Sequence, residues 1–150
     1  SSKSLIVASR LLKIQEDEKI DTNLWVINSS YYSMFFSATG LLAFHGKKIN
    51  SDLGIHKMTY HALIHYFIKE DNKLKIKIAE EYNKALTEAE QILRIGEDKI
   101  KELVVLFDYE LSKRKDFTYE IHDDLEKNKA MTSFNRAKNF CEEINKLIRK

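Results

Sequence analysis

The chain has no proline and only four glycines among its 150 residues. All-β domains change direction about every 8–12 residues and depend on such residues in their turns, so a β-sandwich or a β-barrel is excluded. The glycine-rich phosphate loops GxGxxG and GxxxxGK[ST] do not occur in the sequence, which argues against Rossmann and P-loop enzymes. The sequence therefore predicts an all-α protein.

Composition and length limit the class of protein further. Hydrophobic residues make up 43% and charged residues 32%, as in a soluble globular protein. The length fits one domain, residues 1–150, and the single cysteine, Cys141, excludes a disulfide scaffold. A net charge of +2 gives no strong field for holding nucleic acid. Because no long apolar run and no secretory pattern occurs, we expect a cytoplasmic protein that does not enter a membrane.

Apolar residues recur at helical spacing along most of the chain. Asp21 or Thr22 is expected to cap the second helix, and Gly46 to end it in the left-handed conformation. Gly96 is expected to bend the fourth helix, with a long helix and a split helix both open. The whole predicts an antiparallel up-and-down bundle of four to five helices. The expected helices cover residues 3–18, 23–45, 56–70, 74–112 and 129–148.

The second expected helix is apolar around almost its whole circumference, which is typical of the buried central member of a bundle. Its aromatic residues are therefore interpreted as core, and as base-stacking platforms only in second place. The interpretation as core is less settled for Tyr31 and Tyr32, because each hydroxyl needs a hydrogen-bond partner if it is buried. The aromatic residues in question are Trp25, Tyr31, Tyr32, Phe35, Phe36 and Phe44.

Two features that suggest reactive chemistry have simpler interpretations. Cys141 lies on the apolar stripe of the last helix, which favours a core thiol over a nucleophile. His61 and His65 are spaced to share a helix face and a zinc ion, but no residue completes a ligand set. We therefore predict no metal site and no cofactor.

The segment ELSKRKDFTYEIHDD, residues 110–124, concentrates the side chains best suited to chemistry. An arginine binds phosphate through two hydrogen bonds, and a histidine carries a proton near neutral pH. Arg114 and His122 are therefore candidates for metal-independent cleavage of RNA. The alternative is a solvated turn in which Arg114 pairs with a neighbouring carboxylate.

Two parts of the chain together resemble the HEPN family, the higher eukaryote and prokaryote nucleotide-binding domains. The stretch WVINSSYYSMFFSATGLLAFHGKKINSDLGIHK is similar to the family's YYAMFxAAxALLxxxG…H helix, including the spacing of Gly46 and His56. SKRKDFTYEI and the later AMTSFNRAKNFCEEINKLI are similar to the family's RxxaDY…A…slxxAxxFvxxI ending. The resemblance covers residues 23–148 and implies an up-and-down helical bundle.

The resemblance also implies a function. Many HEPN domains are homodimers that place an R-x4-6-H motif from each subunit at a shared cleft. They act as metal-independent ribonucleases, often as toxins paired with a minimal nucleotidyltransferase antitoxin. Carried onto this chain, Arg114 is the motif arginine and His122 its histidine. The interval here is R-x7-H, however, and on a regular helix the two side chains would diverge by roughly 80°.

We therefore place a HEPN-like nucleotide-, RNA- or partner-binding module first, as a homodimer paired with a minimal nucleotidyltransferase. The alternative is a ribonuclease with Arg114 and His122 as catalytic residues at a dimer cleft, and a purely structural homo-oligomer is third. The expected binding residues are Lys115, Asp116, Tyr119, Tyr31 and Tyr32.

Overall fold

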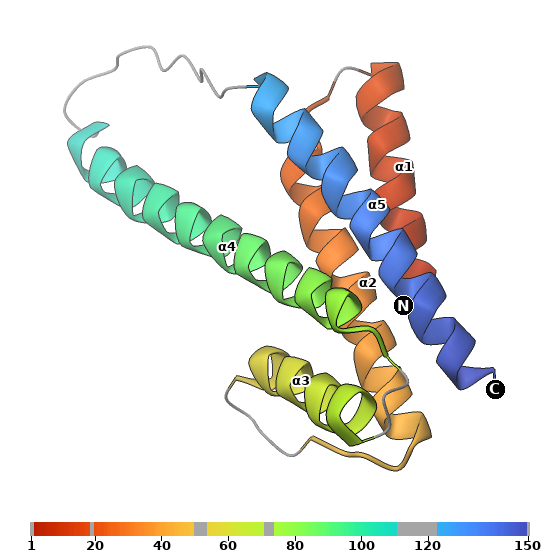
Figure 1. The fold of residues 1–150 in the computed structure, drawn as a ribbon. Coiled ribbons are helices and arrows are strands. Elements are labelled where there is room, and N and C mark those ends of the chain that lie inside the picture. Colours follow the sequence, from red (N-terminus) through yellow and green to blue (C-terminus); the bar gives the residue numbers. More distant parts are fainter. Residues whose placement is uncertain (1, 19, 50–53, 71–73, 111–122, 150) are drawn as a thin grey trace.

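The computed structural model describes residues 2–18, 20–49, 54–70, 74–110 and 123–149. Within these ranges the chain forms helices and no strand, so the predicted all-α class is confirmed. Figure 1 shows α1, α2 and α5 running side by side, α3 lying across one end of α2, and α4 leaving the others in its second half. The helices are α1 Ser2–Glu18, α2 Asn23–Phe44, α3 Ile55–Leu63 with a π-helical continuation Ile64–Glu70, α4 Ile76–Glu110 and α5 Asp123–Ile148.

Helix α2 is the central element, because it packs against α1, α3, α4 and α5. Its apolar residues meet those of the other helices in one main core, where burial of each large side chain contributes about 1.5–3 kcal/mol. The largest fully buried apolar side chains are Tyr82, Phe67, Phe140, Met34, Leu41, Leu42, Leu63 and Ile144.

Small residues line the contact between α2 and α5. Ser33 and Ser37 on α2 and Cys141 on α5 are all buried there. The Ser37 hydroxyl donates to Cys141 Sγ at 3.1 Å, and Cys141 Sγ in turn donates to the Ser33 carbonyl oxygen at 3.5 Å. Small side chains let two helices approach closely, so this contact depends on the absence of bulk. The interpretation of Cys141 as a core thiol is confirmed.

Both ends of α2 follow the expected local chemistry. The N-cap residue, Thr22, makes no side-chain capping hydrogen bond, but the Asp21 side chain one residue earlier accepts a hydrogen bond from the Asn23 amide at 3.0 Å. The Thr22 hydroxyl instead donates to the Leu11 carbonyl at 2.9 Å and ties α1 to α2. Gly46 has φ 68°, and the amides of Gly46 and Lys47 bind back to the last turn, as in a Schellman motif. The predicted left-handed stop is confirmed.

The expected interruption at Gly96 is wrong, because α4 is one helix from Ile76 to Glu110 and runs without a visible bend in Figure 1. A single glycine costs about 1 kcal/mol in a helix interior, which the good helix formers around it offset. Conversely, the expected helix 56–70 is not uniform. It widens into a π-helix, in which His65 Nε2 meets Glu70 Oε1 at 3.1 Å, five residues further on.

An ion-pair network joins α4 to α5. Arg136 Nε lies 2.8 Å from Glu81 Oε2, and its Nη1 lies 2.7 Å from Glu88 Oε2, to which the Ser133 hydroxyl also donates. The Arg136 side chain is only 11% exposed, so water screens these pairs less than a typical surface pair. No helix in the described part of the chain has the length and apolar content needed to cross a membrane.

Candidate functional site

The catalytic candidates Arg114 and His122 lie outside the described residues, as do the expected binding residues Lys115, Asp116 and Tyr119. Of the predicted site, the structure describes only the two tyrosines on α2. They have different environments, since Tyr31 is buried and Tyr32 is exposed at the surface.

Tyr31 belongs to a hydrogen-bonded cluster that joins three helices. Its hydroxyl shares a hydrogen bond with Nδ1 of His56 on α3, with 2.6 Å between the two atoms. Tyr82 on α4 donates from its hydroxyl to the His56 carbonyl oxygen at 3.1 Å. The Phe35 ring lies 4.3 Å from the imidazole, measured between ring centres. We call Tyr31, His56 and Tyr82 the Tyr–His cluster.

The Tyr–His cluster is uncharged at neutral pH. Burial raises the pKa of both Tyr31 and Tyr82, so both phenols stay protonated. Burial also lowers the pKa of His56 from its ordinary value of 6.5, against a smaller opposing effect of Glu90. With Nδ1 held by Tyr31, the chemistry left to His56 is that of Nε2 on a neutral, half-buried imidazole.

The lowered pKa of His56 predicts a pH effect on stability. Because the unfolded chain takes up this proton more readily, the stability due to His56 is present above about pH 6.5 and is lost as the pH falls through the lower folded-state pKa. We expect the urea midpoint to fall from about pH 7.5 to about pH 5, and to fall less in His56→Gln. His61→Gln, at an exposed position of the same helix, is the matched control. Equal pH dependence of the wild type and His56→Gln would contradict this account.

A row of exposed aromatic side chains runs along one face of α2, and we call it the α2 stripe. The interpretation as core is wrong for Trp25, Phe36 and Phe44 and is confirmed for Phe35. Of the two tyrosines that the sequence left open, Tyr31 is buried and Tyr32 is exposed. Within the stripe, the rings of Tyr32 and Phe36 stack with 5.9 Å between their centres, and Tyr32 also borders the His56 ring. Its members and their exposed fractions are Trp25 66%, Tyr32 37%, Phe36 47% and Phe44 61%.

The exposed face of α2 is unusual in carrying no charge. The 22 residues of the helix include no Asp, Glu, Lys or Arg, although charged residues make up 32% of the chain. Surface faces of helices normally carry polar and charged residues, whereas exposed aromatic patches mark interaction sites. The sequence pattern did not reveal that one face of α2 is exposed. A helix that is apolar around its whole circumference gives the same pattern whether every face is buried in its own core or one face is left exposed.

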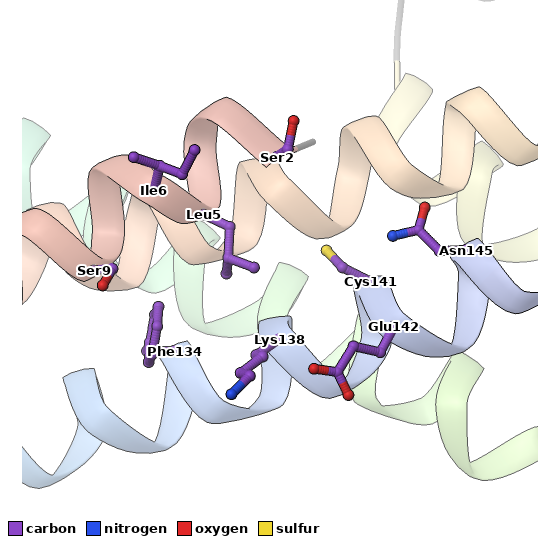
Figure 2. A pocket seen from close by; sticks show the side chains of 9 residues that line it. All are labelled: Ser2, Leu5, Ile6, Ser9, Phe134, Lys138, Cys141, Glu142 and Asn145. Carbon is purple, nitrogen blue, oxygen red and sulfur yellow. The ribbon is translucent and has the colours of Figure 1, made fainter.

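A shallow groove of about 430 Å³ lies between α1 and α5. Figure 2 shows Leu5 on α1 pointing toward α5, with the polar ends of Lys138 and Glu142 on the α5 side. Cys141 borders the groove but is 5% exposed and keeps its hydrogen bonds to α2. The groove thus offers mainly apolar contact, with one cation and one carboxylate on its α5 side.

Among the described residues, no group of three or more His, Cys, Asp or Glu side chains is placed to hold a metal ion. His65 pairs with Glu70 rather than with His61. No family model, no curated protein and no solved structure matches this chain.

The Tyr–His cluster was not predicted as a unit. Tyr31 was singled out from its sequence context and His56 through the spacing of the HEPN resemblance, but nothing in the sequence pairs side chains that lie 25 positions apart. The pairing arises only when α3 folds back across α2.

Proposed function

We propose that this chain is a protein-docking module of HEPN-like architecture, which works by binding a partner along the α2 stripe. The observation that carries this proposal is the uncharged, aromatic and exposed face of α2. Burying apolar surface contributes roughly 25 cal/mol per Å², so four partly exposed aromatic rings on one helix favour association strongly. The HEPN resemblance supports the same class of function, since it implies a module that acts through a second subunit or a minimal nucleotidyltransferase.

The Tyr–His cluster supports docking indirectly. It fixes α3 and α4 to the buried side of α2 through Tyr31, while the next residue, Tyr32, lies beside His56 at the edge of the cluster and is exposed. A stripe held on a rigid helix loses little conformational entropy on binding. The cluster therefore acts as a positioning element for the docking face.

Trp25 makes this proposal testable, because it is the only tryptophan in the chain and lies in the α2 stripe. In dilute, purified protein we expect its fluorescence to be that of a water-exposed indole and to be quenched readily by acrylamide. A docked partner should shift the emission to the blue and slow the quenching. If Trp25 were shielded even at the highest dilution, the face would be covered by the chain itself and the docking proposal would be wrong.

The ribonuclease alternative rests on Arg114 and His122, so no contact among the described residues supports it. A nucleobase could stack on the exposed pair Tyr32 and Phe36 beside His56, as aromatic platforms allow. However, the stripe extends roughly 28 Å from Trp25 to Phe44, at 1.5 Å per helical residue. That length suits a helix of a protein partner better than one or two nucleotides.

A further inference from the structure

We infer that the groove between α1 and α5 is a second docking surface, which takes an amphipathic helix of a partner protein that carries one acidic and one basic side chain a turn apart. This surface is separate from the α2 stripe, because no residue of the stripe lines it. The residues that line the groove are Ser2, Leu5, Ile6 and Ser9 on α1 and Phe134, Lys138, Cys141, Glu142 and Asn145 on α5.

The shape of the groove fits a helix. Its walls are two helices that run side by side in opposite directions (Figure 1), and the lining positions on each recur at helical spacing, so each wall is a continuous ridge. From Phe134 to Asn145 the α5 wall is roughly 16 Å long at 1.5 Å per residue, the length of about three helical turns. The groove is shallow along this length, whereas a small molecule binds in a pocket that encloses most of its surface.

The groove lies at an open corner of the helical bundle. On α5, the side that carries Arg136 meets α4, and another side meets α2. Lys138 lies two residues after Arg136, about 200° around the helix, so the groove is on a different side of α5. Within the described residues this side is left open by the other helices. A helix laid here would have α1 and α5 as its neighbours, as a member of an up-and-down bundle does.

The α1 wall presents apolar surface between two small residues. Ile6 lines the groove and is 52% exposed, beside the half-buried Leu5. Ser2 and Ser9 lie at the two ends of this wall, and small side chains let the backbone of a second helix approach closely. An apolar stripe on the incoming helix would therefore cover Leu5 and Ile6, as in other complexes in which a helix lies in a groove.

The charges on the α5 wall determine the chemistry of the partner. Lys138 and Glu142 both line the groove, are exposed and lie one helical turn apart (Figure 2). Neither forms an ion pair with another of the described residues. A helix complements them with a carboxylate opposite Lys138 and a cation opposite Glu142. A nucleic acid or an anionic membrane surface presents charge of one sign and is repelled by Glu142.

Synthetic helical peptides test the inference. They have about 18 residues, because shorter helices are marginal in water, and they contain an apolar stripe and no tryptophan. At one edge of the stripe, two positions a turn apart carry one Glu and one Lys, two Glu, or two Lys. In a calorimetric titration of the wild-type chain, we expect the mixed peptide to bind about two- to fivefold more tightly than either of the others, as exposed ion pairs allow.

Ile6→Glu and Val7→Glu are matched variants, because the two residues are neighbours of similar exposure, 52% and 47%, and only Ile6 lines the groove. Ile6→Glu should weaken binding of the mixed peptide about tenfold or more, since half of an apolar side chain is no longer buried by the peptide. Val7→Glu should leave the affinity unchanged. Glu142→Lys makes both charges on the α5 wall positive, so it should shift the preference to the peptide with two Glu.

Three results with the peptides overturn the inference: no binding at roughly 1 mM, equal weakening by Ile6→Glu and Val7→Glu, or the same order of affinities in Glu142→Lys and the wild type. Dimerisation of the wild-type chain that Ile6→Glu abolishes would make the occupant a second copy. Binding of dodecanoate without binding of any peptide would make it an acyl chain. Both of these results overturn the inference as well.

Trp25 separates this inference from the proposed function, because it lies in the α2 stripe and does not line the groove. A peptide bound in the groove leaves the emission of Trp25 unchanged. A peptide that shifts the emission to the blue is bound at the α2 stripe, which supports docking there and overturns the groove as its site. Failure of every peptide to bind in the groove leaves the docking proposal for the α2 stripe intact.

Discussion

Truncation of Tyr82 to alanine is expected to lower the free energy of unfolding by about 3–5 kcal/mol, the range for removing a large aromatic from a core. Tyr82 is fully buried on α4, its ring packs near those of Tyr31 and Phe140, and its hydroxyl holds the His56 carbonyl. Alanine leaves a cavity where three helices meet. Since the free energy of unfolding of a domain of this size is only about 5–15 kcal/mol, this loss would remove a large part of it. Chemical denaturation followed by circular dichroism measures it.

Tyr82→Phe is the matched control, because it keeps the ring and removes only the hydroxyl. We expect a loss of about 0.5–1.5 kcal/mol, the usual contribution of one hydrogen bond. If Tyr82→Ala and Tyr82→Phe lost similar amounts, packing would not be the main contribution of this residue. A loss below about 1 kcal/mol for the alanine variant would show that Tyr82 does not occupy the core.

Replacement of Ser33 by leucine is expected to be the second most damaging change. Ser33 is fully buried in the contact of α2 with α5, where its carbonyl accepts from Cys141 and its hydroxyl donates to the Ser30 carbonyl at 2.7 Å. Leucine adds bulk where no space exists, and overpacking costs about 1–3 kcal/mol or more. We expect a lower urea midpoint and loss of the sharp amide NMR signals of α5.

Ser33→Ala separates size from polarity in this contact. It removes the hydroxyl without adding bulk, so the change in unfolding free energy should stay within about 1 kcal/mol. A leucine variant as stable as the alanine variant would mean that α2 and α5 are not closely packed at this position.

Local features of the fold were predictable from the sequence, whereas those that depend on distant partners were not. The ends of α2 followed from Asp21 and Gly46, because capping and left-handed turns are set within a few residues. The bend expected at Gly96 failed because a local cost of about 1 kcal/mol is small beside the bonds of a 35-residue helix. The π-helical segment after α3, in which Phe67 is buried in the core, was not indicated by any pattern in the sequence.

In the candidate site, too, local features were predictable and those that depend on distant residues were not. Tyr31 and Tyr32 were singled out as neighbours whose hydroxyls need partners, and this was useful because one is bonded to His56 and the other is exposed. Which of the two is buried depends on the rotation of α2 against α3 and α5, a property of the assembled bundle. Hydrophobicity alone assigned Trp25 and Phe36 to the core, because it does not show which face of an apolar helix stays exposed in the folded chain.

The length of α4 has a mechanical consequence. Ile92 on α4 packs with Val26 and Ile27 on α2, and the helix continues to Glu110 in a direction that leads away from α2 and α5 (Figure 1). The backbone from Ile92 to Glu110 is roughly 27 Å long, at 1.5 Å per residue, so a change of about 10° in the helix direction at Ile92 corresponds to a displacement of Glu110 by roughly 5 Å. The stretch that follows carries Arg114 and His122. A small change in the direction of α4 at Ile92 would thus alter the position of the end of this helix by several ångströms.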